Sequence, residues 1–398
     1  MLIFISTLSF SQEELKSKDI LDFVTTFKII DGQIIGQGAD TIKKRISESQ
    51  FFLLGEQHYS PEISELTNCI LPILASKDFD NFVIEIGPNS ASKLVNVIKN
   101  QNSLLNFNSD FYEKYNDIPI PFFDGKKDEV FLKTAISNGF KLWGIDQEYL
   151  SSHMFLIEEL YNQSENRESL KQYFDDLNAF IISDFAKGNN DDSYPMFTNL
   201  LNSKEVKQFF AKASTKSEKL ITSELIKSWE IYALNETKRY SESNTTRMEN
   251  MKRNFGVHYR NVQKNISLPK VFVKLGSMHL ANGKNWLGIY DLGNMINELA
   301  YFNDTKSTSI NCFARYSMDV SGNIYDYLEE DGGEDYRLIL ELAKKDEWIL
   351  IETKPILKLA NIKKVKLNDN LKILISGFDY ILFSPTRTQT ELNYVGKN

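Results

Sequence analysis

Two histidines follow buried apolar segments at the same spacing, and they are the strongest candidates for chemistry in this chain. Residues 51–58 read Phe-Phe-Leu-Leu-Gly-Glu-Gln-His, and residues 271–279 read Val-Phe-Val-Lys-Leu-Gly-Ser-Met-His. An apolar run that stops at Gly indicates a buried strand, so His58 and His279 should each lie in the turn beyond a strand. The chain has only 4 His, and two of them share this pattern. We infer that the two imidazoles act together.

Carboxylates occur at the ends of the same predicted strands. Glu85 lies inside the apolar stretch Val-Ile-Glu-Ile of residues 83–86, where an unpaired carboxylate would cost several kcal/mol. It must therefore meet a cation, a metal or a hydrogen-bond donor, or stay protonated. Glu56 stands two residues before His58, and Asp146 ends a third predicted strand. Because the carboxyl ends of parallel strands meet at one edge of a sheet, these groups are expected to converge with His279.

Two chemistries fit this set of side chains. Two His with carboxylates suit a first-row divalent ion such as Zn, Mn, Fe or Co, which lowers the pKa of a bound water. Without a metal, His58 or His279 would activate water while a carboxylate orients the ring. Structural alternatives stay open, because Asp146 could cap a helix and Glu85 could form an ion pair with Arg247. His153 and His258 are expected to be structural.

Strands alternate with helices before residue 150, which favours βαβ units and an α/β fold with a mostly parallel central sheet flanked by helices. The segment before residue 47 is expected to form helices, and residues 103–124 a loop. Strands are expected over residues 51–55, 82–87 and 140–146, and helices over 61–75, 91–98 and 130–138.

The sequence becomes helical and strongly polar after residue 150, which predicts a large all-α insertion over about 151–265. Ile221, Leu225, Trp229 and Tyr232 form an amphipathic stripe in it. We expect a single α/β domain over residues 13–398, with its core at about 47–150 and 266–398. Later strands are expected over residues 309–316, 348–351 and 380–383, with a loop over 319–335.

Composition limits the partners and the compartment. The net charge of -8, without a long basic block, argues against nucleic acid, and two cysteines exclude a disulfide framework and a Cys-rich metal site. No segment reaches the roughly 20 apolar residues of a transmembrane helix. Residues 1–12 look like a signal-peptide remnant without its basic leader. We therefore expect export to the periplasm or the extracellular space, with a cytoplasmic protein as the alternative.

Five short motifs, in order, resemble those of the erythromycin-esterase-like, TIKI/TraB-like and ChaN-like superfamily. Leu-Gly-Glu-Gln-His (54–58) resembles its first Gly-x-x-His motif and Leu-Gly-Ser-Met-His (275–279) the second. Val-Ile-Glu-Ile-Gly (83–87) is similar to the strand that carries the Glu of that group. Trp-Gly-Ile-Asp (143–146) and Arg-Met-Glu-Asn-Met (247–251) look closest to the esterase branch. The resemblance spans residues 51 to 299 and implies a hydrolase with an α/β core and a helical insertion.

The resemblance also implies roles for individual residues. His58, Glu85 and His279 would be central, Glu56 and Asp146 would line the site, and Arg247 would add an electrostatic contact. The TIKI-like branch uses a metal, the esterase branch activates water with His and Glu alone, and ChaN-like members bind haem.

Two departures distinguish this chain from the esterase branch and favour the metal-dependent one. Gly276 stands where that branch has a further His, and Thr67 stands near where it has an Arg. We therefore expect a metal-assisted hydrolase that acts on an ester or peptide bond of a small molecule or peptide, with His58, Glu85 and His279 as metal ligands. The alternative is a haem- or metal-binding protein without turnover.

Overall fold

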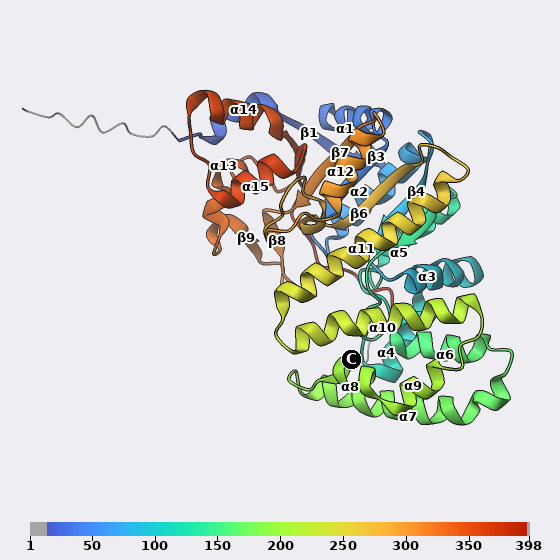
Figure 1. The fold of residues 1–398 in the computed structure, drawn as a ribbon. Coiled ribbons are helices and arrows are strands. Elements are labelled where there is room, and N and C mark those ends of the chain that lie inside the picture. Colours follow the sequence, from blue (N-terminus) through green and yellow to red (C-terminus); the bar gives the residue numbers. More distant parts are fainter. Residues whose placement is uncertain (1–13, 396–398) are drawn as a thin grey trace, which may run out of the picture.

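The computed structural model describes residues 14–395, so the predicted signal-peptide remnant at residues 1–12 lies outside the described part. A nine-stranded sheet forms the centre of the protein (Figure 1). The strands lie in the spatial order β2 (Gln33–Ile35), β1 (Val24–Ile30), β10 (Trp348–Glu352), β11 (Tyr380–Phe383), β7 (Ser307–Phe313), β3 (Phe51–Glu56), β6 (Lys270–Gly276), β4 (Phe79–Ile84) and β5 (Lys141–Gly144).

Six neighbouring strands, from β11 to β5 in that order, are parallel, and the three at the other edge pair antiparallel. The predicted α/β fold with a mostly parallel sheet is therefore confirmed. β3 and β6 lie side by side in the middle, with Glu56 opposite Gly276. Every residue of β3 is buried, as expected for a central parallel strand.

Helices cover both faces of the sheet. Phe52 and Leu54 of β3 face one hydrophobic core, and Phe51 and Leu53 face the other. The first core is covered by α1 (Gln37–Glu48), α2 (Pro61–Ala75), α3 (Pro88–Gln101) and α5 (Lys126–Ser137). The second is covered by α11 (Tyr240–Gln263), α12 (Leu292–Phe302), α13 (Arg337–Leu340), α14 (Thr353–Lys363) and α15 (Asp369–Gly377).

Only helices lie between β5 and β6, and in Figure 1 most of them form the lower layer. In chain order they are α6 (His153–Gln163), α7 (Arg167–Asn190), α8 (Met196–Asn202), α9 (Lys204–Phe210), α10 (Lys216–Glu236) and α11. The predicted stripe on α10 is real, because Ile221, Leu225 and Trp229 are all buried. The last helix, α11, returns to the sheet and carries Arg247 to its edge.

Three local predictions were wrong. The segment before residue 47 forms the 3-10 helix η1 (Ser17–Phe23) and the hairpin β1–β2 before α1. Its β-branched residues favour strand, and Asp31-Gly32 has positive φ at both positions, as a two-residue hairpin turn requires. Residues 103–124 contain the helix α4 (Leu105–Tyr115). The loop predicted over residues 319–335 contains β9 (Ile324–Asp326), which pairs with β8 (Tyr316–Met318) just before it, and the 3-10 helices η3 (Tyr327–Glu329) and η4 (Gly333–Tyr336).

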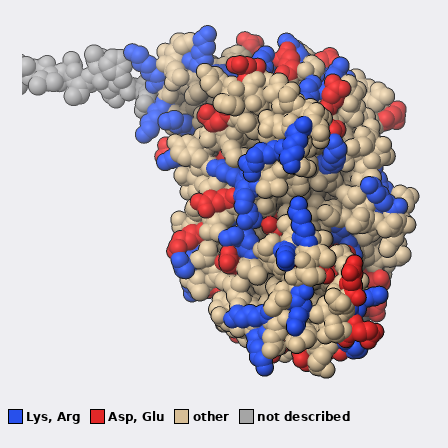
Figure 2. All heavy atoms as spheres, turned by 45° about the vertical axis from the view of Figure 1, so that its right-hand side comes forward, with Lys and Arg blue, Asp and Glu red and all other residues tan. Residues whose placement is uncertain are grey.

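Acidic and basic side chains both lie on the face shown in Figure 2. Among residues 14–395, no helix has the length and apolar character needed to cross a membrane.

Candidate active site at the carboxyl edge of the sheet

Three parallel strands end in acidic residues at the same edge of the sheet. Glu56 is the last residue of β3, Glu85 follows β4 directly, and Asp146 follows β5. The ends are tied together, since the Asp146 backbone N–H donates to the Ile86 carbonyl at 3.0 Å. β6 lies between β3 and β4 and leads into η2 (Ser277–Leu280), which carries His279. The predicted convergence of these strand ends is therefore real.

Glu85 is the centre of this cluster, and its side chain is only 4% exposed. One carboxylate oxygen accepts a hydrogen bond from Arg247 Nη2 at 2.8 Å, and the other accepts one from the Gly276 backbone N–H at 2.6 Å. His279 Nε2 lies 3.4 Å and His58 Nε2 3.7 Å from the first oxygen. Burial alone would raise the pKa of Glu85, but the nearby imidazoles and Arg247 hold this pKa well below its usual value.

His58 lies between two carboxylates in the loop after β3. Its Nδ1 is 3.3 Å from Glu56 Oε1, which is an ion pair when the ring is protonated, although the contact lacks hydrogen-bond alignment. The ring stacks on Phe122 with 4.0 Å between centroids, and 30% of the His58 side chain is exposed. Burial alone would lower the pKa of His58, but Glu56 and Glu85 favour the charged ring and raise this pKa to about 9.

His279 has closer contacts to its carboxylate partners than His58. Its Nδ1 lies 2.9 Å from Asp291 Oδ2, while Nε2 faces Glu85. Burial opposes the charged ring, but the Glu85 charge and the hydrogen bond to Asp291 raise the pKa of His279 to about 10. Asp291 is also the N-cap of α12, where its other oxygen accepts from the Leu292 N–H at 2.7 Å. A carboxylate–imidazole pair of this kind fixes the direction of Nε2.

A buried lysine is the partner of the buried carboxylate of Glu56. Lys274 of β6, 5% exposed, forms an ion pair with the carboxylate of Glu56. Burial would raise the pKa of Glu56, but Lys274 and His58 outweigh it and lower this pKa. Lys274 interrupts the apolar run of β6, which was the same kind of signal that singled out Glu85.

Asp146 and Arg247 complete the cluster. The Arg247 guanidinium donates to both oxygens of Asp146, from Nε at 3.0 Å and from Nη2 at 2.5 Å. The same guanidinium binds Glu85, so the structural ion pair considered above exists as part of the site. Burial opposes the charge of Arg247, but both carboxylates raise its pKa above the ordinary value.

The cluster contains eight ionisable side chains, in which four acidic groups face four basic ones. The structure therefore brings together all six predicted residues and adds Lys274 and Asp291. The carboxylates are Glu56, Glu85, Asp146 and Asp291, and the cations are His58, His279, Arg247 and Lys274.

The predicted metal ligands do not fit a divalent ion well. Both oxygens of Glu85 already accept hydrogen bonds, one of them from the guanidinium of Arg247. A metal at the imidazole nitrogens would lie beside that positive charge. Within the described ranges, no three His, Cys, Asp or Glu side chains are grouped so as to hold a metal ion. The ligand set of His58, Glu85 and His279 stays a prediction.

The two remaining histidines lie outside the cluster. His153 is buried in α6 with its ring edge-on to Trp229 and Phe185, and burial lowers its pKa to about 4. His258 stacks on Trp143 with 5.3 Å between centroids. Both positions fit the structural roles expected from the sequence.

Gly276 makes room for His58. A Cβ built at this position would lie 2.8 Å from His58 Nε2 and 3.2 Å from Glu85 Oε2. The backbone φ of -51° suits any residue, so the constraint is space alone. The Gly that departs from the esterase branch is therefore coupled to the position of the His58 ring.

Replacing Gly276 by Ala is expected to lower kcat/KM for turnover at this site by about 10- to 100-fold, because a displacement of order 1 Å of a reacting side chain has this effect. The melting temperature should change little. Steady-state assays on the Gly276→Ala and Gly256→Ala variants test this, since Gly256 of α11 has only the flexible Arg260 side chain near its added Cβ. Equal activity of the two variants would contradict the role assigned to Gly276.

Fold and site together define an α/β protein with a His, Glu and Arg cluster at the carboxyl edge of its sheet. Three solved structures share this fold over nearly their whole length. A mutant of erythromycin esterase EreC in its open conformation matches at 15% identity, with a TM-score of 0.58 and coverage of 93% of this chain and 99% of that one. A succinoglycan biosynthesis protein matches at 14% identity, with a TM-score of 0.57 and coverage of 94% and 97%. A Bacillus cereus protein matches at 15% identity, with a TM-score of 0.53 and coverage of 92% and 96%.

The resemblance to the erythromycin-esterase-like group is thus confirmed at the level of the fold. Family models give no match to the sequence, and curated proteins give none either.

Proposed function

We propose that this protein is a hydrolase in which His58 activates water beside Glu85. One observation carries the proposal: two carboxylate–imidazole pairs, Glu56 with His58 and Asp291 with His279, approach the same oxygen of Glu85. Such pairs orient and charge an imidazole for acid and base work. The similarity in fold to an esterase supports this reaction class.

His58 suits the role of general base better than His279. It is the more exposed ring, at 30% against 13%, so water and a substrate can reach it more easily. A neutral His58 with its proton on Nδ1, toward Glu56, directs the lone pair of Nε2 toward Glu85.

The reaction then uses the groups as follows. A water held at Glu85 attacks the carbonyl carbon while His58 Nε2 takes its proton. The negative charge that develops on the carbonyl oxygen is stabilised by the cationic His279 and Arg247. His58 returns the proton to the leaving oxygen or nitrogen as the bond to carbon breaks, so water is added across an ester or a peptide bond.

This mechanism does not need the metal that the sequence favoured, because Arg247 and the two imidazoles already supply positive charge around Glu85. A divalent ion and haem binding without turnover remain the competing predictions. Haem binding would require an imidazole to leave its carboxylate partners, and His58 would also leave its stack on Phe122.

The test is ester and amide hydrolysis before and after exhaustive chelation. Wild-type protein is expected to hydrolyse members of a p-nitrophenyl ester panel with unchanged kcat after chelation. Glu85→Gln should lose about 100- to 1000-fold in kcat/KM, as expected for a group that holds the reacting water. Glu249→Gln, an exposed carboxylate on α11, is the matched control.

Two outcomes would overturn the proposal. Activity that disappears on chelation and returns with Zn or Mn would favour the metal-dependent mechanism. An inactive protein whose Soret spectrum shifts with haem, and no longer shifts in His58→Ala, would favour the binding protein.

A further inference from the structure

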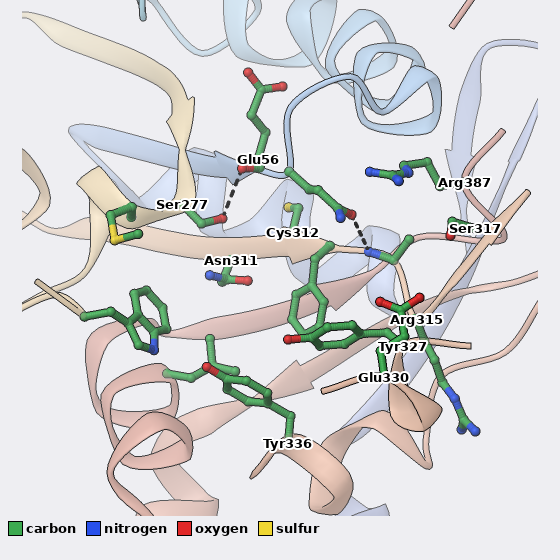
Figure 3. Close-up of a pocket in the computed structure, with 16 residues that line it drawn as sticks. Glu56, Ser277, Asn311, Cys312, Arg315, Ser317, Tyr327, Glu330, Tyr336 and Arg387 are labelled. Carbon is green, nitrogen blue, oxygen red and sulfur yellow. Dashed lines mark hydrogen bonds between the residues drawn. The ribbon is translucent and has the colours of Figure 1, made fainter. Parts of the chain in front are cut away.

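A cavity of about 570 Å³ adjoins the cluster (Figure 3). Glu56, Ser277 and Met278 line it, and the Ser277 hydroxyl donates to the Glu56 carbonyl at 3.4 Å across the ends of β3 and β6. Ser277 and Met278 are the two residues between Gly276 and His279. The backbone segments that position His58 and His279 therefore also form part of the cavity lining. Its volume lies within the roughly 300–1000 Å³ of small-molecule sites.

Four aromatic side chains form part of the lining of this cavity. In Figure 3, Tyr327 and Tyr336 lie across the cavity from Arg387. Trp286 and Phe313 line it as well. Flat aromatic walls of this kind suit a flat apolar ligand, because ring–ring contacts add to the burial of apolar area.

Two arginines line the cavity, and they differ in their partners. The Arg315 guanidinium donates to both oxygens of Asp326, from Nε at 2.8 Å and from Nη2 at 2.7 Å. Across residues 14–395, the Arg387 guanidinium forms no ion pair and no side-chain hydrogen bond, although it is only partly exposed. Figure 3 shows it extending toward the Glu56 side of the cavity.

The backbone of Arg387 is fixed by two hydrogen bonds, so its side chain extends from a defined place in the cavity lining. Its N–H donates to the Tyr316 carbonyl at 2.8 Å, and its carbonyl accepts from the Met318 N–H at 2.8 Å. A guanidinium presents parallel N–H donors that match a carboxylate or a phosphate. Glu330 also lines the cavity, but it is exposed, so water and salt screen its charge.

We propose that this cavity binds the substrate through a flat apolar body stacked on its aromatic walls and an anionic group, carboxylate or phosphate, held by Arg387. This assignment of substrate class rests on the proposed hydrolase function. The binding of such an anion is measurable without turnover.

The experiment is a calorimetric and tryptophan-fluorescence titration with 2-naphthoate, 2-naphthyl phosphate and uncharged 2-naphthol. Wild-type protein is expected to bind at least one of the anions, and the choice between them separates carboxylate from phosphate recognition. Arg387→Gln should weaken that anion at least about 10-fold, as expected for the loss of a charge-assisted bidentate contact, while binding of 2-naphthol stays the same. The affinity of Arg387→Lys for the anion should lie between that of the wild type and that of Arg387→Gln. Trp286→Phe should remove most of the fluorescence change and so place the ligand in this cavity.

The controls separate this inference from the proposed function. Glu330→Gln, which removes a negative charge from the cavity lining, should not weaken binding of the anion. Glu85→Gln should keep the binding and lose hydrolysis; if it keeps hydrolysis, the mechanism is wrong while the ligand assignment stands. Equal binding of the anion by wild-type protein and a folded Arg387→Gln variant, or tighter binding of 2-naphthol than of either anion, would overturn the inference.

Discussion

Replacing His58 by Asn is expected to lower kcat/KM for hydrolysis by about 100- to 10,000-fold, the range for loss of a general base. Asn keeps a polar side chain of similar reach but cannot take a proton from water. Glu56 retains Lys274 as its partner, so the fold should persist. Steady-state kinetics with circular dichroism at matched concentrations measure both effects.

The pH dependence tests the same role with a definite sign. His58 must be neutral to act as a base, and its pKa is raised to about 9. Wild-type kcat/KM should therefore rise with pH through neutrality and level off above pH 9, and His58→Asn should lose this rise. His258→Asn, which alters a ring stacked on Trp143, is the matched control and should keep the rise. A His58→Asn variant with more than a third of wild-type activity would exclude the assignment.

The core of the site could be predicted because two signals in the sequence are local. A buried apolar run that ends at Gly marks a strand end, and this placed His58 and His279. A carboxylate within an apolar run needs a partner, and this selected Glu85. The rule that parallel strands share a carboxyl edge then joined segments that are far apart in the chain.

Lys274 and Asp291 belong to the site but were not predicted from the sequence. Lys274 carries the same signal as Glu85, a charge inside a buried run, but its partner Glu56 lies 218 residues away and only the strand pairing of β3 with β6 joins them. Asp291 stands at the start of a helix, where capping α12 is reason enough for an acidic residue. Its second role, toward His279, becomes visible only once the turn between them is folded.

The sequence could not decide between a metal and an ion pair at Glu85. Two His and a carboxylate suit a divalent ion, and the alternative partner, Arg247, reaches Glu85 from the far end of a long helical insertion, which no local pattern shows. Phe122 is a similar case. It lies in an aromatic segment without periodicity, and its positive φ of 65° belongs to the conformation that stacks its ring on His58.

Replacing Arg247 by Met is expected to lower the free energy of unfolding by about 3–5 kcal/mol at pH 7, because buried Asp146 loses its cation and buried Glu85 keeps only the two imidazoles. Met keeps most of the apolar stem of Arg, so the loss of unfolding free energy reflects the missing charge. In the wild type the pKa of Glu85 is held well below its usual value. A lowered folded-state pKa contributes stability above the unfolded value of about 4.3, and this contribution is lost as the pH falls. The difference between wild type and variant should therefore be largest near neutrality and shrink below pH 4.

Urea denaturation at pH 7 and at pH 3, where the difference should already have shrunk, measures this effect. Combining Arg247→Met with Glu85→Gln should recover part of the loss at pH 7, since the neutral amide no longer needs a counterion and the two residues are in contact. Arg239→Met is the matched control, because Arg239 precedes the same helix and pairs with Glu242 at the surface, so its midpoint should not move. Two results would contradict this prediction: a loss smaller than about 1 kcal/mol for Arg247→Met, or a loss that is the same at both pH values. Either would show that the ion pairs of Arg247 with Glu85 and Asp146 do not stabilise the fold, and that any role of Arg247 lies in turnover alone.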